Sequence, residues 1–304
     1  ALEAAQAVAI PHNREIIHVI QRGFTVDGQD GIRTPIGMHG YRLEVEAHII
    51  TASQTTVENL RQCVQAAGVE VNQFVLNPLA SGEVVLTETE RQMGVVVCDI
   101  GGGTTDMAIY IDGDVWHTMV IALGGNHITS DIAHGLRLSL EQAEEVKKAH
   151  GHALEREVSP EEAITIRTFG EEGPKQVSRR ELAMIIEARA EEIFQHVLQE
   201  IKRSGYDGLL PAGMVLTGGA SLLPALRPLA SQVLGLPVRL ARPENLMGLT
   251  DQLNSPAYST SVGLLYWALL MSEASVPSLR GRHRNQGGVI DWESVKSFFK
   301  RLLP

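Results

Sequence analysis

Hydrophobic and polar positions follow two different periods in the first 70 residues. Apolar and polar residues partly alternate in residues 15–20 and 42–50, which is typical of strands with one buried face. A glycine-rich loop separates these two segments. In residues 55–67 the apolar positions instead recur every three or four residues, which predicts an amphipathic helix that ends at Gly68.

Strands and helices alternate from residue 95 onward, which predicts an α/β fold. An apolar strand at 95–100, a glycine bend and two further strands form a predicted meander that reaches residue 122. Helices are predicted after Gly124, after Ser139 and after Ser178, each of the last two with a capping box. A short strand at 214–217 precedes another helix, and the polar stretch 152–177 is predicted to be partly loop-like.

The glycine bend carries the candidate chemistry. Backbone N–H groups of Gly101, Gly102 and Gly103 and the hydroxyls of Thr104 and Thr105 form a pattern typical of a phosphate cradle. The carboxylates of Asp99 and Asp106 are hard oxygen ligands that suit Mg²⁺ held through water. The alternative is a hairpin turn without a ligand, which needs fewer glycines than this segment contains.

A second glycine turn follows the strand at 214–217. Gly218 and Gly219 let a backbone approach a ligand closely, with Ala220 and Ser221 at its edge. An ordinary strand-to-helix turn explains this segment equally well until it is paired with the first bend. Glu187 on the long helix is a candidate for the ribose or adenine, and a solvated surface residue is the equal alternative.

Composition narrows the function classes. The formal net charge of −10 and an aromatic content of 5% argue against nucleic acid as a partner. Cys63 and Cys98 make neither a disulfide framework nor a zinc signature, and Cys98 is predicted to fill the core. No apolar run reaches the length that a membrane-spanning helix needs, and 262–271 is predicted to be a buried helix.

Residues 272–304 differ in hydrophobic pattern and composition from the rest of the chain. Residues 291–304 have the pattern of an amphipathic helix that lies in an anionic membrane surface. Its predicted membrane-binding residues are Trp292, Val295, Lys296, Phe298, Phe299, Lys300, Arg301 and Leu302. Residues 272–290 are rich in Ser, Gly and Arg and predict a flexible tether. The alternative is a terminal helix docked on the protein's own core.

Both glycine motifs resemble motifs of the actin-like ATPase superfamily. Residues 99–106 resemble its second phosphate motif and residues 217–221 its adenosine motif. Further segments resemble FtsA, the cell-division family within that superfamily, and they are residues 9–15, 19–21, 27–29, 35–38 and 130–133. The resemblance implies an actin-like (ribonuclease H-like) two-lobe α/β fold.

The resemblance also implies a division of the chain. It assigns 1–51 to the FtsA-type small subdomain used for self-association and 52–92 to the rest of the first lobe. The second nucleotide-binding lobe is assigned to 93–271, with 136–178 as its small upper subdomain. The tether is assigned to 272–290 and the membrane-targeting helix to 291–304. No Asp-x-Gly motif precedes Asp99, so we expect the first lobe to be incomplete, as in an N-terminally truncated chain.

The function implied is that of an ATP- and Mg-binding scaffold. The resemblance implies self-association into filaments, binding of the FtsZ C-terminal tail, recruitment of other division proteins and attachment to the cytoplasmic membrane at the septum. Asn77 stands before Pro78 where the chaperone branch has an acid, so slow or absent hydrolysis is expected, and no residue is assigned a catalytic role.

Two alternatives remain open from the sequence. One is a pilus-assembly ATPase of the same superfamily, which grips a membrane partner's peptide. The other is a sugar or small-acid kinase on this fold, which needs a catalytic base and a sugar pocket whose signatures the sequence lacks.

Overall fold

The computed structural model describes residues 5, 7–169, 173–244, 246 and 253–274. The predicted membrane helix at 291–304 lies outside these residues, and so does the predicted tether from residue 275 on. Residues 272–274 belong to the last described helix, so the predicted tether begins too early. Within the described residues no helix is long and apolar enough to cross a membrane.

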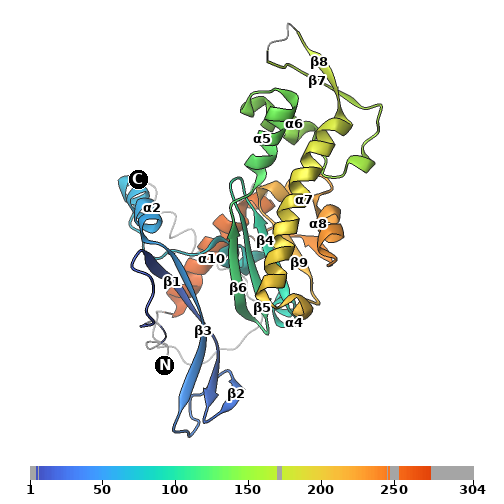
Figure 1. The fold of residues 1–304 in the computed structure, drawn as a ribbon. Helices are drawn as coiled ribbons and strands as arrows, with labels where there is room; N and C mark the ends of the chain where they lie inside the picture. Colours follow the sequence, from blue (N-terminus) through green and yellow to red (C-terminus); the bar gives the residue numbers. More distant parts are fainter. Residues whose placement is uncertain (1–4, 6, 170–172, 245, 247–252, 275–304) are drawn as a thin grey trace.

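A five-stranded sheet is the centre of the described chain (Figure 1). Its order is β10 (Val238–Leu240), β9 (Met214–Thr217), β4 (Val95–Ile100), β5 (Thr105–Ile111) and β6 (Asp114–Ile121). The strands β4, β5 and β6 form the predicted antiparallel meander, whereas β9 pairs with β4 and β10 with β9 in parallel. Every residue of β4 and β5 is buried, because helices cover both faces.

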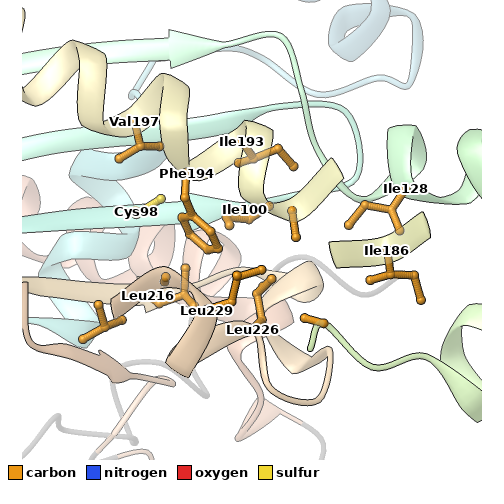
Figure 2. Packing of buried hydrophobic residues seen from close by; sticks show 14 of the residues in the cluster. Cys98, Ile100, Ile128, Ile186, Ile193, Phe194, Val197, Leu216, Leu226 and Leu229 are labelled. Carbon is orange, nitrogen blue, oxygen red and sulfur yellow. The ribbon is translucent and has the colours of Figure 1, made fainter. Parts of the chain in front are cut away.

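Alternate residues of β4 face two different cores. Val96, Cys98 and Ile100 join a large cluster under α5 (Gly125–Leu136), α7 (Arg179–Ser204) and α8 (Leu226–Leu234). Figure 2 shows the Phe194 ring pointing from α7 towards Ile100 and Leu229. The prediction that Cys98 fills the core is confirmed, since its side chain is fully buried in this cluster.

The opposite face of the sheet is covered by α3 (Asn77–Val85) and α10 (Ser259–Ala274). These two helices touch where Gly263 meets α3, since a Cβ on Gly263 would lie 1.9 Å from the Ala80 carbonyl oxygen. Only a glycine permits this approach of backbone to backbone. The exposed α4 (Glu88–Met93) begins with a capping box of Thr87 and Glu90.

Residues 14–66 form a separate small sheet with one helix. Here β1 (Arg14–Val26) pairs on one side with β2 (Gln29–Ile32) and on the other with β3 (Leu43–Ser53), and α2 (Gln54–Ala66) follows. The prediction of two strands and a helix is confirmed, while β2 forms inside the segment predicted to be a loop. The sheet adjoins β6 through Arg22, whose guanidinium stacks on Trp116.

The segment beyond α5 carries α6 (Leu140–His150) and a hairpin of β7 (Ala163–Ile166) and β8 (Lys175–Ser178). The capping box of Ser139 and Gln142 is confirmed. The predicted box of Ser178 and Glu181 is wrong, because Ser178 caps α7 by accepting from Arg180. The hairpin was predicted as partly loop-like, since four-residue strands give too little alternation to detect.

Short 3₁₀ turns complete the described chain. They are η1 (Glu155–Glu157), η2 (Asp207–Leu209), η3 (Gly219–Leu222) and η4 (Pro256–Tyr258).

Candidate functional site

The two glycine turns meet at one cavity of about 520 Å³. Gly101 and Gly102 line it from the first turn, and Gly219 and Ala220 from the second. The register of β4 and β9 explains the meeting, because Asp99 is paired with Thr217 and both strands run in the same direction. Further walls come from α5 and α6, and the apolar part of the lining includes Ile128, Leu222 and Leu223. A partly open cavity with polar backbone and an apolar wall suits a nucleotide-sized ligand.

Several backbone polar groups of the first turn are already hydrogen-bonded within the protein. The Gly101 N–H donates to the Thr104 carbonyl at 2.9 Å, and this bond closes the bend. The carbonyls of Gly101 and Gly102 accept from the N–H groups of Gly125 and Asn126, at the start of α5. The expectation that Gly101 presents its N–H to a phosphate is therefore corrected.

Around Gly103 a built Cβ meets nothing within 4 Å, so this part of the turn is open.

The two threonines differ. The Thr105 side chain is fully buried and its hydroxyl donates to the Leu123 carbonyl at 2.8 Å. It therefore offers no hydroxyl to a phosphate, which corrects the prediction. The Thr104 hydroxyl donates to Asp106 Oδ2 at 2.7 Å and fixes that carboxylate.

Asp99 and Asp106 are cross-strand partners and lie 6% and 5% exposed. Burial raises the pKa of both, and the neighbouring Asp106 charge raises the pKa of Asp99 further. Hydrogen bonds from Thr260 to Asp99 and from Asn77 to Asp106 oppose these shifts. Asn77 thus lies beside Asp106, with its amide 3.4 Å from Asp106 Oδ2.

The fit to magnesium can be tested on this donor set. Among the described residues no group of three or more His, Cys, Asp or Glu could hold a metal ion. A pair of buried carboxylates fits an ion that keeps most of its waters and takes the rest of its ligands from phosphates. Neither carboxylate lines the cavity itself, so Asp99 and Asp106 would hold Mg²⁺ only through such waters.

The second turn is pressed against the first motif. Gly218 has φ +88°, and a Cβ there would lie 2.4 Å from Asp99 Oδ1. Ser221 is buried and its hydroxyl donates to the Gly218 carbonyl at 2.6 Å. Ser221 therefore closes the turn and does not line the cavity, whereas Gly219 and Ala220 do.

Glu187 is neither a ligand contact nor a solvated surface residue, the two roles considered from the sequence. Its carboxylate accepts the backbone N–H of Glu155 and so holds the η1 turn against α7. The cavity lining does not include it. The prediction that Glu187 meets a ribose or adenine is not supported by this geometry.

Sequence reasoning missed the polar wall on α6. Lys147 is 13% exposed, lines the cavity and donates to the Gly125 carbonyl at 3.0 Å and to Thr129 Oγ1 at 2.8 Å. Its partner Glu144 also lines the cavity. Burial raises the pKa of Glu144, but Lys147 and Thr129 outweigh this and lower it to about 2. The predicted ion pair of Glu144 and Lys148 is present at 3.2 Å. Lys147, the residue before Lys148, also forms an ion pair with Glu144, and the sequence analysis missed this second pair.

Similar solved structures agree with this architecture. The chain resembles the type IV pilus biogenesis complex of PilM and PilN with a TM-score of 0.62 at 19% identity, over 88% of this chain and 70% of that one. It resembles MreB5 of Spiroplasma citri bound to ADP with a TM-score of 0.57 at 20% identity, over 73% and 68% of the two chains. The fold is therefore that of the actin-like proteins.

Sequence relatives identify the family within this class. A family described as cell division protein FtsA matches residues 96–263, and one described as the SHS2 domain inserted in FtsA matches 1–51. Cell division protein FtsA of Pseudomonas aeruginosa is 43% identical and that of Bacillus subtilis 45%, each over 88% of this chain. The chain belongs to the FtsA family of cell division proteins. It spans 64% and 59% of the length of these two relatives.

Proposed function

We propose that this chain forms the nucleotide-binding part of an actin-like scaffold that binds ATP with Mg²⁺. The cavity between the two glycine turns carries this proposal, because backbone of both turns, the first residues of α5 and the Lys147 side chain all line it. Two similar structures were solved with ADP and with AMPPNP, which supports a nucleotide as the ligand class.

Slow or absent hydrolysis is part of the proposal. An attacking water needs a base, and the side chain that α3 places on Asp106 is the amide of Asn77, at 3.4 Å. An amide can orient a water but cannot take its proton. Nucleotide then acts by favouring one conformation of the scaffold, and its effect equals its difference in affinity for the two conformations.

The division role follows from family membership. We propose that the protein anchors the FtsZ ring to the cytoplasmic face of the membrane at the septum, self-associates into filaments and recruits later division proteins. Residues 1–51 are the proposed self-association subdomain, 52–92 the rest of the first lobe, and 93–271 the second lobe with 136–178 as its upper part. The membrane helix is proposed at 291–304. FtsA relatives above 40% identity favour this role over pilus assembly.

Nucleotide binding is tested by titrating the full chain with a fluorescent ATP analogue in excess magnesium. Lys147→Met keeps the apolar stem of the side chain and removes the cation from the cavity. We expect it to weaken binding about tenfold, because it removes a positive charge from the cavity wall and leaves the Glu144 carboxylate there without its nearest cation, which disfavours an anionic ligand. Lys202→Met, at an exposed site near the end of α7, is the matched control and should bind as the wild type does. Equal affinities of both variants, or no binding by the wild type, would contradict the proposal.

Attachment is tested by sedimentation with vesicles that contain anionic lipid. The full chain should sediment with the vesicles, and a chain without residues 291–304 should not. Binding of the FtsZ C-terminal tail peptide, measured by fluorescence anisotropy, should be the same for both forms. Sedimentation of the shortened chain would refute the assignment of the anchor.

A further inference from the structure

The first turn of α10 is hydrogen-bonded to the end of β4. The Thr260 hydroxyl donates to Asp99 Oδ2 at 2.7 Å, although the two residues are 161 positions apart in the sequence. A threonine in a helix commonly donates to a carbonyl of the preceding turn instead. The hydroxyl of Thr260 is therefore used for a tertiary contact with a carboxylate of the candidate site.

The neighbouring Ser259 fastens the same turn to the second glycine motif. Its oxygen lies 2.7 Å from Thr217 Oγ1, and both side chains are fully buried. The Thr217 hydroxyl donates its single proton to the Ala241 carbonyl, so Ser259 is the donor in this pair. The backbone adds a third bond, in which the Gly218 N–H donates to the Pro256 carbonyl at 3.2 Å. The start of α10 is thus held in place by bonds other than that of Thr260 to Asp99.

Asp99 is confined from its other side as well. Its Oδ1 atom lies so close to Gly218 that a Cβ on that residue would come within 2.4 Å. The side chain is 6% exposed, so water does not compete strongly for its oxygens. Gly218 against Oδ1, the Thr260 hydroxyl on Oδ2 and a further hydrogen bond with Ser81 restrict the orientation of this carboxylate.

Resting on the proposed binding of ATP with Mg²⁺, we propose that Thr260 is a positioning residue for the metal. Its hydroxyl fixes the Asp99 carboxylate before the metal arrives, while the remaining lone pairs of the carboxylate stay available for metal-bound water. A carboxylate that is already oriented loses less rotational freedom on binding, and this raises affinity. The effect concerns the magnesium-dependent part of nucleotide binding, because Thr260 does not line the nucleotide cavity.

The test compares ATP affinity of the full chain in excess magnesium and in EDTA, using a fluorescent ATP analogue. The ratio of the two dissociation constants measures the magnesium contribution. Thr260→Val keeps the shape and removes the donor, and we expect this ratio to fall about tenfold, with the affinity in EDTA unchanged. Thr260→Ser restores the donor and should restore the ratio to within about twofold. Ser261→Ala, at an exposed position in the same turn, is the control and should leave it unchanged.

Thermal unfolding of each variant separates positioning from general damage. A Thr260→Val protein that melts like the wild type and has lost the magnesium ratio supports the inference. An unchanged ratio in Thr260→Val overturns it, and so does a ratio that Thr260→Ser fails to rescue. If Thr260→Val does not fold, Thr260→Ala provides the same comparison. If the wild type itself shows no magnesium-dependent binding, the proposed function fails, which is a different result from failure of Thr260 alone.

Discussion

Replacement of Gly218 by alanine should destabilise the protein more than replacement of any glycine in the first turn. Gly218 has φ +88° and ψ 162°, a region that residues with a Cβ occupy only under strain. This strain costs on the order of 1–3 kcal/mol. The added Cβ would also lie 2.4 Å from Asp99 Oδ1 and 2.5 Å from the Ile100 carbonyl oxygen, and such overpacking costs about 1–3 kcal/mol more.

The two costs add to about 2–6 kcal/mol, a large part of the 5–15 kcal/mol that holds a typical domain folded. Each kcal/mol corresponds to roughly 2–4 °C for a domain of this size, so the midpoint of thermal unfolding should fall by about 10 °C. Guanidinium denaturation and thermal unfolding of the full chain, followed by circular dichroism, measure the loss. Because β4 is central, we expect one cooperative transition to shift.

Gly103 provides the matched control. A Cβ there meets nothing within 4 Å, and its φ does not lie in the positive region. Gly103→Ala should therefore change the free energy of unfolding by less than about 1 kcal/mol, with a possible gain from a more restricted unfolded chain. If Gly218→Ala unfolds within about 1 kcal/mol of Gly103→Ala, the contact between the two motifs is not as tight as the structure has it.

Three further predictions concern stability alone. Burial raises the pKa of Glu90, but hydrogen bonds from Arg239 and Thr87 outweigh it and hold this pKa at about 2. This lowered pKa contributes stability that is complete above about pH 4.5 and lost as the pH falls towards 2, up to about 3 kcal/mol in all. Urea unfolding at pH 7 and pH 3 should show about 2 kcal/mol of that loss, and Glu90→Gln should reduce it.

Burial, with the nearby charges of Arg22 and His117, lowers the pKa of His48 to about 4, so its neutral form stabilises the fold above pH 6.5; unfolding curves should show a loss of stability between pH 6.5 and 4 that His48→Gln reduces. Phe194→Ala should cost about 3–5 kcal/mol because the ring is fully buried, whereas Phe169→Ala, at a site 67% exposed, should cost less than about 0.5 kcal/mol; equal costs in guanidinium unfolding would refute the assigned core.

The elements that follow from local pattern were predictable. The meander from residue 95, the capping box at Ser139 and the amphipathic helix α2 each depend on residues close together in the sequence. The hairpin of β7 and β8 was not predictable in the same way, since strands of four residues are stabilised by burial of Ile164 and Ile166 rather than by their own pattern.

The positions of the two glycine turns and the family they resemble follow from the amino-acid order alone, because a glycine's missing side chain acts at its own position. Which groups meet at these turns depends on chain packing. Parallel pairing of β9 with β4 brings the turns together, and helix packing brings Lys147 to the cavity and Thr260 to Asp99. Contacts of this kind also turned Ser221 and Glu187 away from the cavity, since the partner that accepts or donates each hydrogen bond is set by chain packing rather than by spacing in the sequence.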